Sequence, residues 1–200
     1  MSHDHYGYYL GWGSVAFLPT IYTLQVQYLG RYPVDLTFNQ AIGVLSLGLG
    51  GYALFRSANH QKDVVRSTNG QCTIWGAKPR YIRCRYRTDD GRTHESLLLC
   101  SGVYSSMHSP SSRPYPILMM HPGWWGWSRH ANYLGDLMQA FSMCAVCGFD
   151  HLLPWSYFFF MAVILLHRIL RDEERCSKKY GKNWEQYCSK VSWRLLPTIY

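Results

Sequence analysis

A tract near the C-terminus carries side chains that bind ligands or move protons, spaced three or four residues apart. They are a fixed cation, a carboxylate, a thiol, an amide and two phenols: Arg168, Asp172, Cys176, Tyr180, Asn183 and Tyr187. If one helix runs through the tract, this spacing places them all on one face. That face could hold an anionic ligand and transfer a proton. A solvated helix whose charges meet lipid headgroups explains the spacing more simply, and Gly181 could interrupt the helix.

Two further polar groups flank apolar stretches. In FRSANHQKDVVR, Lys62 and Arg66 could clamp phosphate oxygens, the arginine through a bidentate fork. Basic side chains that extend from a membrane helix toward headgroups are the simpler interpretation of this group. In WWGWSRHANYLGD, Asn132 and Asp136 fall at the predicted edge of the bilayer, where polar groups are costly and tend to be functional.

The histidines and cysteines of this sequence do not show the spacing of a metal site. His3 and His5 in HDHYG stand two apart without a third ligand, and Cys144 and Cys147 lie in an apolar run that favours packing residues. Seven cysteines without paired metal spacing predict reduced thiols rather than disulfides or zinc ligands. We therefore predict no metal site.

Four apolar stretches approach the roughly 20 residues that span a bilayer. They are residues 9–29, 38–55, 133–149 and 152–170. Eight tryptophans, within an aromatic content of 16%, suit membrane–water interfaces. The sequence predicts an all-α multi-pass membrane protein with about four transmembrane helices, which must bring the polar groups to one membrane face.

Positive charge follows the second and fourth stretches and is sparse after the first and third. The positive-inside rule then places the loop after residue 55 and the C-terminus in the cytosol. In this loop CTIW, YIRCRYR and THESLLL are short extended runs, and DDGR between the last two predicts a small β-hairpin. The net charge of +8 suits lipid headgroups or a phosphate-bearing ligand, and we predict no nucleic-acid partner.

The motifs together resemble the sterol reductase family. The resemblance lies in LLHRILRDEERCSKKYGKNWEQY, ANHQKD, RHANYLGD and the final RLLPTIY. HDHYGYYLGWG, NGQCTIWGAKP and FDHLLP resemble the branch that reduces the C7=C8 double bond of 7-dehydrocholesterol to give cholesterol. Nearly the whole chain is covered except the Ser/Pro-rich residues 103–123, which look like an insertion where the family keeps a short segment.

The resemblance implies an enzyme of sterol biosynthesis in the endoplasmic reticulum membrane, with a sterol substrate, surrounding membrane lipid and the cofactor NADPH. Residues 1–200 would be the C-terminal, NADPH-binding half of such an enzyme. By motif match, the cofactor-binding residues would be Lys62, Arg66, Leu99, Trp125, Asn132, Tyr133, Arg168, Asp172, Cys176, Ser177, Lys178, Lys179, Tyr180 and Tyr187.

Reduction of an unactivated ring double bond needs a proton first. Protonation gives a carbocation, and hydride transfer from the cofactor then quenches it. We expect Tyr187 to be the acid or its relay, with Asp172 hydrogen-bonded nearby. Two other classes stay open. One is a membrane methyltransferase of the isoprenylcysteine type, whose C-terminal region has a similar RHxxYxG stretch. The other is a non-catalytic sterol-binding protein like the lamin B receptor.

Overall fold

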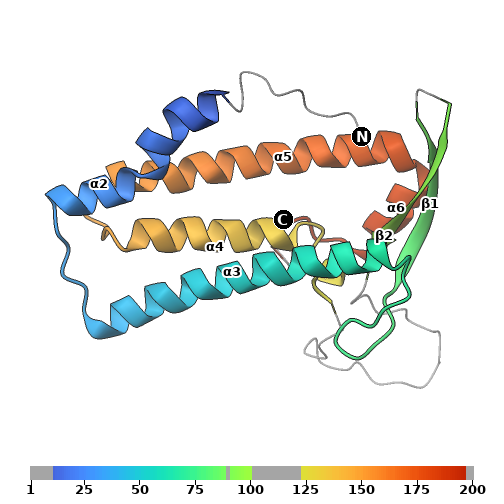
Figure 1. Ribbon diagram of the computed structural model, residues 1–200, viewed down its shortest axis with the longest axis horizontal. Helices are drawn as coiled ribbons and strands as arrows, with labels where there is room; N and C mark the ends of the chain where they lie inside the picture. Colours follow the sequence, from blue (N-terminus) through green and yellow to red (C-terminus); the bar gives the residue numbers. More distant parts are fainter. Residues whose placement is uncertain (1–10, 89–90, 101–122, 197–200) are drawn as a thin grey trace. The chain divides into compact units, whose positions relative to one another are not determined.

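The computed structural model describes residues 11–88, 91–100 and 123–196, which are mostly helical with one small sheet (Figure 1). In chain order the elements are η1 Gly13–Tyr22, α2 Leu24–Arg31, α3 Phe38–Ser67, β1 Tyr81–Arg87, β2 Thr93–Leu99, η2 Trp124–Gly126, α4 Ala131–Ala145, η3 Leu153–Trp155, α5 Ser156–Tyr180 and α6 Lys182–Lys190. The chain forms two compact units. Unit 1 is Met1–Tyr52 with Asp136–Leu166, and unit 2 is Ala53–Gly135 with His167–Tyr200.

Two of the four predicted membrane spans are long and apolar enough to cross a bilayer, by length and composition. They are α3, with 30 residues, and the run Leu153–Tyr180, with 28. The first predicted span is divided between η1, a π-helix that contains Pro19, and α2. Helix α4 has 15 residues, which is short of the roughly 20 that a span needs. Four uninterrupted spans are therefore not found in the described residues.

Helix α3 begins and ends at signals that the sequence carries. At its start, the Thr37 backbone N–H donates to Gln40 Oε1 at 3.0 Å, and the Gln40 N–H donates to Thr37 Oγ1 at 3.4 Å, which is a capping box. At its end, Asn69 has a φ of 51°, and the Gly70 N–H donates to the Val65 carbonyl at 2.8 Å. This is a Schellman motif, which satisfies the last helical carbonyls. The helix therefore ends at Ser67, one residue after Arg66.

Unit 1 has its own core, built where α4 and the start of α5 meet. Ala140, Cys144, Trp155 and Tyr157 are its main buried members. The side chain of Ser142 on α4 donates to the Val44 carbonyl on α3 at 2.8 Å. At Gly48 on α3, an added Cβ would lie 2.7 Å from Ser142 Oγ. Glycine is therefore needed for this close approach of the two helices.

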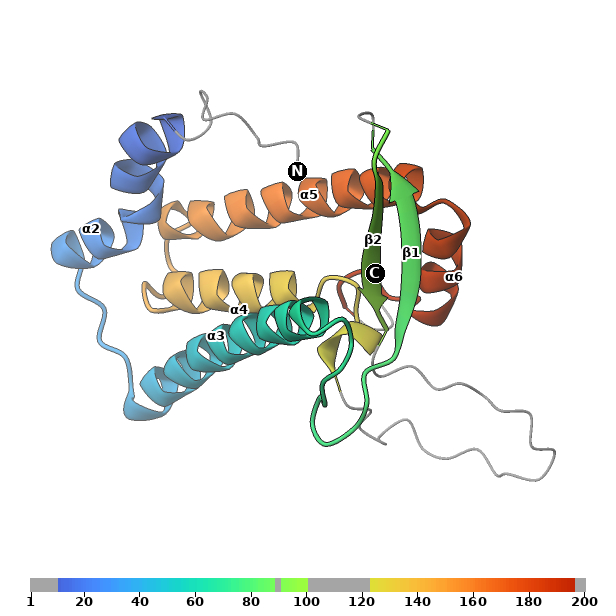
Figure 2. The same cartoon turned by 45° about the vertical axis from the view of Figure 1, so that its right-hand side comes forward.

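The predicted β-hairpin is present in unit 2, with Tyr81 opposite Leu99 and Arg87 opposite Thr93 (Figure 2). Successive strand residues face opposite sides, and the last residues of β2, 97 to 99, are buried on both. Leu97 and Leu99 belong to a first core cluster, whereas Leu98 joins a second one with Ile82. The hairpin therefore separates two apolar clusters. The CTIW run is not a strand, because Ile74 only bridges Ala77 across a tight turn.

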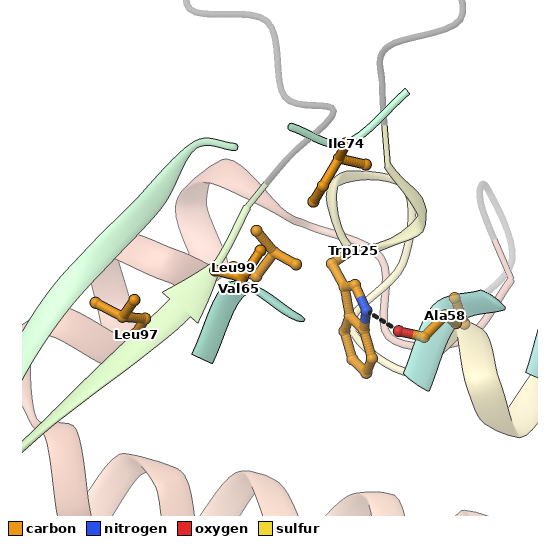
Figure 3. Close-up of a cluster of buried hydrophobic side chains, with 7 residues drawn as sticks. Ala58, Val65, Ile74, Leu97, Leu99 and Trp125 are labelled. Carbon is orange, nitrogen blue, oxygen red and sulfur yellow. Dashed lines mark hydrogen bonds between the residues drawn. The ribbon is translucent and has the colours of Figure 1, made fainter. Parts of the chain in front are cut away.

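The first cluster packs the end of α3 against β2 and the turn η2 (Figure 3). Trp125 is 5% exposed, and its indole N–H donates to the Ala58 carbonyl of α3 at 2.7 Å. Val65, Leu97 and Leu99 complete the surroundings. The second cluster packs β1 and Leu98 against Trp184 and Tyr187 of α6, which lies beside β1 in Figures 1 and 2.

The helix predicted through the C-terminal tract is interrupted at Gly181. This residue has a φ of 50°, a region that glycine enters without steric cost. Helix α5 ends at Tyr180, and α6 begins at Lys182 with a new direction. The seven cysteines are free thiols. The predictions for His3 and His5, and for an insertion at residues 103–123, lie outside the described residues except at Gly123.

The Schellman motif gives a stability prediction at Gly70. An added Cβ there would overlap the Tyr81 ring, and the φ of 82° disfavours any side chain. We expect Gly70→Ala to lower the free energy of unfolding by about 2–4 kcal/mol. Gly76→Ala is the matched control, because its φ is 83° but no atom lies within 4 Å of its Cβ. It should cost only about 1 kcal/mol, and equal losses in thermal unfolding would contradict the overlap.

Candidate functional site

A cavity of about 220 Å³ lies within unit 2, where residues from five parts of the chain converge. It is bordered by the end of α3, the end of β2, the segment from η2 into α4, the end of α5, and α6. The lining residues are Lys62, Arg66, Leu97, Leu98, Leu99, Trp125, Arg129, His130, Asn132, Tyr133, Asp172, Cys176, Tyr180, Trp184 and Tyr187.

Most of the residues expected from the family resemblance line this cavity together. They are Lys62, Arg66, Leu99, Trp125, Asn132, Tyr133, Asp172, Cys176, Tyr180 and Tyr187. The break at Gly181 does not remove Tyr187 from the group, because α6 turns back against the hairpin. Trp184, rather than the expected Asn183, accompanies Tyr187, and their rings lie 5.2 Å apart between centroids.

Four expected residues do not line the cavity. The Arg168 guanidinium lies 5.7 Å from the ring centroid of Tyr133, so it is near a lining residue and not on the cavity wall itself. Ser177, Lys178 and Lys179 are exposed on the outer turn of α5. Lys178 pairs with Glu174 at 2.6 Å, and Lys179 Nζ lies 3.9 Å from the Tyr86 ring centroid. Because consecutive helical residues point in different directions, the run 176–180 could not all face one cavity.

The sequence prediction missed five lining residues. Leu97 and Leu98 were hidden in an apolar run, and Trp184 follows from the i, i+3 spacing to Tyr187. Arg129 and His130 belong to the same RHANY stretch as Asn132. Their polar types beside a predicted membrane edge were the signal that could have found them.

The cationic part of the site comes from one helical turn of α3. Lys62 and Arg66 are four residues apart and therefore share a face. The Lys62 ammonium lies 4.7 Å from the centroid of the Trp125 ring, which attracts cations through its π face. Because Trp125 is itself bonded to Ala58 on the preceding turn, the lysine is held over a fixed platform.

The acidic group of the site is paired with a phenol. Tyr133 donates its hydroxyl to Asp172 Oδ2 at 3.0 Å, which joins α4 to α5. Asp172 and Tyr187 both line the cavity, and no hydrogen bond between their side chains is found in the described part of the chain. Tyr187 is 5% exposed, and burial raises the pKa of its phenol. The phenol therefore keeps its proton at neutral pH.

A partly buried ion network holds the segment that precedes α4. Arg129 and Arg194 both pair with Glu173 of α5, at 3.1 Å and 2.8 Å. The backbone N–H groups of Arg129 and His130 donate to the carbonyls of Trp193 and Arg194, each at 3.0 Å. The C-terminal residues therefore fix the backbone that presents residues 129 to 133 to the cavity.

His130 borders the cavity as a buried imidazole. It is 9% exposed, and its ring stacks on Tyr133 with centroids 5.1 Å apart and planes 11° apart. Burial lowers the pKa of His130 to about 4, although nearby Asp172 acts in the opposite direction. At neutral pH the side chain is therefore uncharged.

Comparison with known proteins finds one family and several close relatives. The family described as "Ergosterol biosynthesis ERG4/ERG24 family" matches residues 1–112 and 116–200. The chain is 50% identical over 198 residues to 7-dehydrocholesterol reductase of Xenopus laevis, covering 99% of this chain and 37% of that protein. The protein of the same name from Danio rerio is 48% identical, again with 99% of this chain and 37% of the relative covered.

A more distant relative has a different printed activity. Delta(14)-sterol reductase of Methylotuvimicrobium alcaliphilum is 38% identical over 200 residues, covering 100% of this chain and 40% of that protein. The chain thus spans well under half the length of the curated relatives it matches.

The buried imidazole predicts a pH dependence of stability. In the unfolded chain a histidine has a pKa of about 6.5, whereas the pKa of His130 in the folded chain is about 4. The unfolded state therefore binds the proton more tightly. The contribution of His130 to the free energy of unfolding is complete above pH 6.5 and is lost as the pH falls toward 4. We expect a loss of about 2 kcal/mol at pH 5 relative to pH 7.5.

Thermal unfolding in detergent at the two pH values measures this loss. His130→Gln, which cannot be protonated, should remove most of it. His94→Gln, at an exposed position of the hairpin, is the matched control and should retain it. A His130→Gln variant with the full pH dependence of the wild type would contradict the assignment.

Proposed function

The chain belongs to the ergosterol biosynthesis ERG4/ERG24 family, and on that premise we propose that it is the NADPH-binding part of an enzyme that reduces the C7=C8 bond of 7-dehydrocholesterol to cholesterol. The two relatives named 7-dehydrocholesterol reductase, at 50% and 48% identity, support this choice of substrate. The proposal places the enzyme in the endoplasmic reticulum membrane, with two apolar helices suited to a bilayer.

One observation carries the proposal: cationic, acidic and phenolic side chains from α3, α4, α5 and α6 border one cavity. NADPH has several negative charges, so its site needs cations that can approach phosphate oxygens. Lys62 and Arg66 supply two such cations. The cavity of about 220 Å³ is smaller than typical small-molecule pockets of about 300–1,000 Å³. We therefore assign to it one end of the dinucleotide rather than the whole.

The remaining lining residues would orient the ligand and handle a proton. NADPH supplies the hydride when it is bound. In our proposal Tyr187 holds the proton that the ring double bond must gain, because burial keeps its phenol protonated. Asp172 accepts the Tyr133 hydroxyl and so fixes that ring against His130. Leu97, Leu98 and Leu99 would exclude water from this side of the site.

The methyltransferase alternative fits the same cavity less well. S-adenosylmethionine carries a sulfonium cation and no phosphate, so two cations in one turn of α3 would repel it more than they hold it. The names of the relatives also favour reduction over methyl transfer. A purely sterol-binding role would leave the cations of α3 without a partner in the ligand.

NADPH titration tests the cofactor assignment. Lys62→Gln should weaken NADPH binding by roughly 10–100-fold, because a charge-assisted hydrogen bond contributes about 1.5–3 kcal/mol. The quenching of tryptophan fluorescence reports binding, since Trp125 borders the cavity. Lys182→Gln, at an exposed residue outside the cavity, is the matched control and should bind as the wild type does. If S-adenosylmethionine binds instead of NADPH, the proposal is wrong.

Sterol turnover tests the role of Tyr187. Tyr187→Phe removes the hydroxyl and keeps the ring in its cluster, so turnover of 7-dehydrocholesterol should fall by about 10²–10⁴-fold. NADPH affinity should change little. Tyr81→Phe, at a partly buried residue outside the cavity, is the control and should leave turnover intact. Loss of the ring diene absorbance follows the reaction. Unchanged turnover in Tyr187→Phe would refute the assignment.

A further inference from the structure

Two neutral polar atoms beside the cavity have no hydrogen-bond partner among the described residues. They are Nε2 of His130 and Oδ1 of Asn132, and both are buried. Both residues line the cavity, and Ala131 between them is fully buried. A buried polar atom without a partner costs about 1–3 kcal/mol. Folded proteins rarely leave two such atoms side by side unless water or a ligand meets them.

The orientation of the Asn132 amide is set from outside the cavity. Its Nδ2 donates to Oδ1 of Asn59 on α3, at 3.3 Å. This bond uses the donor end of the amide and leaves the carbonyl oxygen as an acceptor. Asn59 does not line the cavity. It therefore acts on a ligand only through Asn132.

The ring and the backbone of His130 are each held by a contact. Its ring stacks on Tyr133, and its backbone N–H donates to the Arg194 carbonyl at 3.0 Å. As an uncharged imidazole it has one N–H donor and one acceptor nitrogen. A neutral ring does not compete with Lys62 and Arg66 for phosphate. It complements an uncharged polar group instead.

An acceptor oxygen beside an imidazole matches the two ends of a primary carboxamide. The carboxamide N–H₂ can donate to Asn132 Oδ1, and its carbonyl can accept from Nε2–H of His130. We propose that His130 and Asn132 form a neutral recognition edge for the carboxamide of the nicotinamide ring, with Asn59 as a positioning residue. This inference rests on the proposed function, since it assumes that the ligand is NADPH.

The test compares NADPH with its 3-acetylpyridine analogue, in which a methyl ketone replaces the carboxamide. The analogue keeps the carbonyl and loses the N–H₂ donor. The wild-type chain should bind NADPH roughly tenfold more tightly, the worth of one hydrogen bond in a buried site. Asn59→Leu releases the Asn132 amide, so this preference should fall to about one- to threefold. His130→Leu should weaken both cofactors alike, because both have the carbonyl.

A conservative variant separates positioning from a merely structural effect. Asn59→Asp retains an acceptor for Asn132 Nδ2 and should therefore keep the preference for NADPH. His60→Asp adds the same negative charge at the next, exposed residue, so it shows how far charge alone weakens both cofactors. If Asn59 instead donated to Asn132, Asn59→Asp would lose the preference as Asn59→Leu does, which would overturn the assigned orientation.

The outcomes also separate this inference from the proposed function. Should the wild-type chain bind neither cofactor, the proposed function fails. Should it bind both equally well, or should Asn59→Leu weaken both by the same factor, NADPH remains the ligand but the carboxamide contact is wrong. Equal weakening would point to the ribose, which the two cofactors share.

Discussion

The largely buried carboxylate of Glu173, which bridges two arginines, is the group on which the candidate site depends. It pairs with Arg129 and Arg194, and the side chains of Arg129 and Glu173 are only 8% and 14% exposed. Charges with little exposure are tolerated when they are paired. Arg194, at 40% exposure, remains partly in solvent. The network joins α5 to the segment before α4 and to the C-terminal residues. That junction is what presents residues 129 to 133 to the cavity.

The groups around the cavity divide into two chemical kinds. Lys62 and Arg66 carry fixed positive charge, whereas His130 and Asn132 offer uncharged atoms without partners among the described residues. A dinucleotide also has two kinds of group, anionic phosphates and neutral bases. Because the phosphates would contact the cations and the neutral base would contact the uncharged atoms, one small cavity can favour one orientation of the ligand as well as bind it tightly. The apolar residues of β2 offer no polar side-chain atoms that could orient the ligand.

Local signals in the sequence predicted much of the fold. Helix α3 begins at Phe38, where the second apolar stretch was predicted to start, and the strands YIRCRYR and THESLLL also begin and end where expected, since each depends on neighbouring residues alone. Helical spacing also grouped Asp172, Cys176 and Tyr180 correctly. Spans were harder to predict, because apolar composition does not reveal that the first stretch divides at Thr23, between η1, which contains Pro19, and α2. The third apolar stretch also extends to residue 149, beyond the end of the 15-residue helix α4 at Ala145.

Other parts of the site could not be read from spacing. Glu173 lies in a charged run, RDEER, where most members face solvent, and only the approach of Arg129 and Arg194 identifies it. Likewise Asn59 and Asn132 are 73 residues apart, and no periodicity connects them. Such pairings depend on how distant segments pack.

The bend at Gly181 has a consequence for how this chain can vary. In one straight helix, Tyr187 would lie about 10 Å along the axis beyond Tyr180, at 1.5 Å per residue. The bend returns it to the same cavity. Each residue added between Gly181 and Tyr187 would rotate the phenol by about 100° around α6. The length of the spacer KNWEQ, more than its composition, therefore determines the direction in which the Tyr187 ring points.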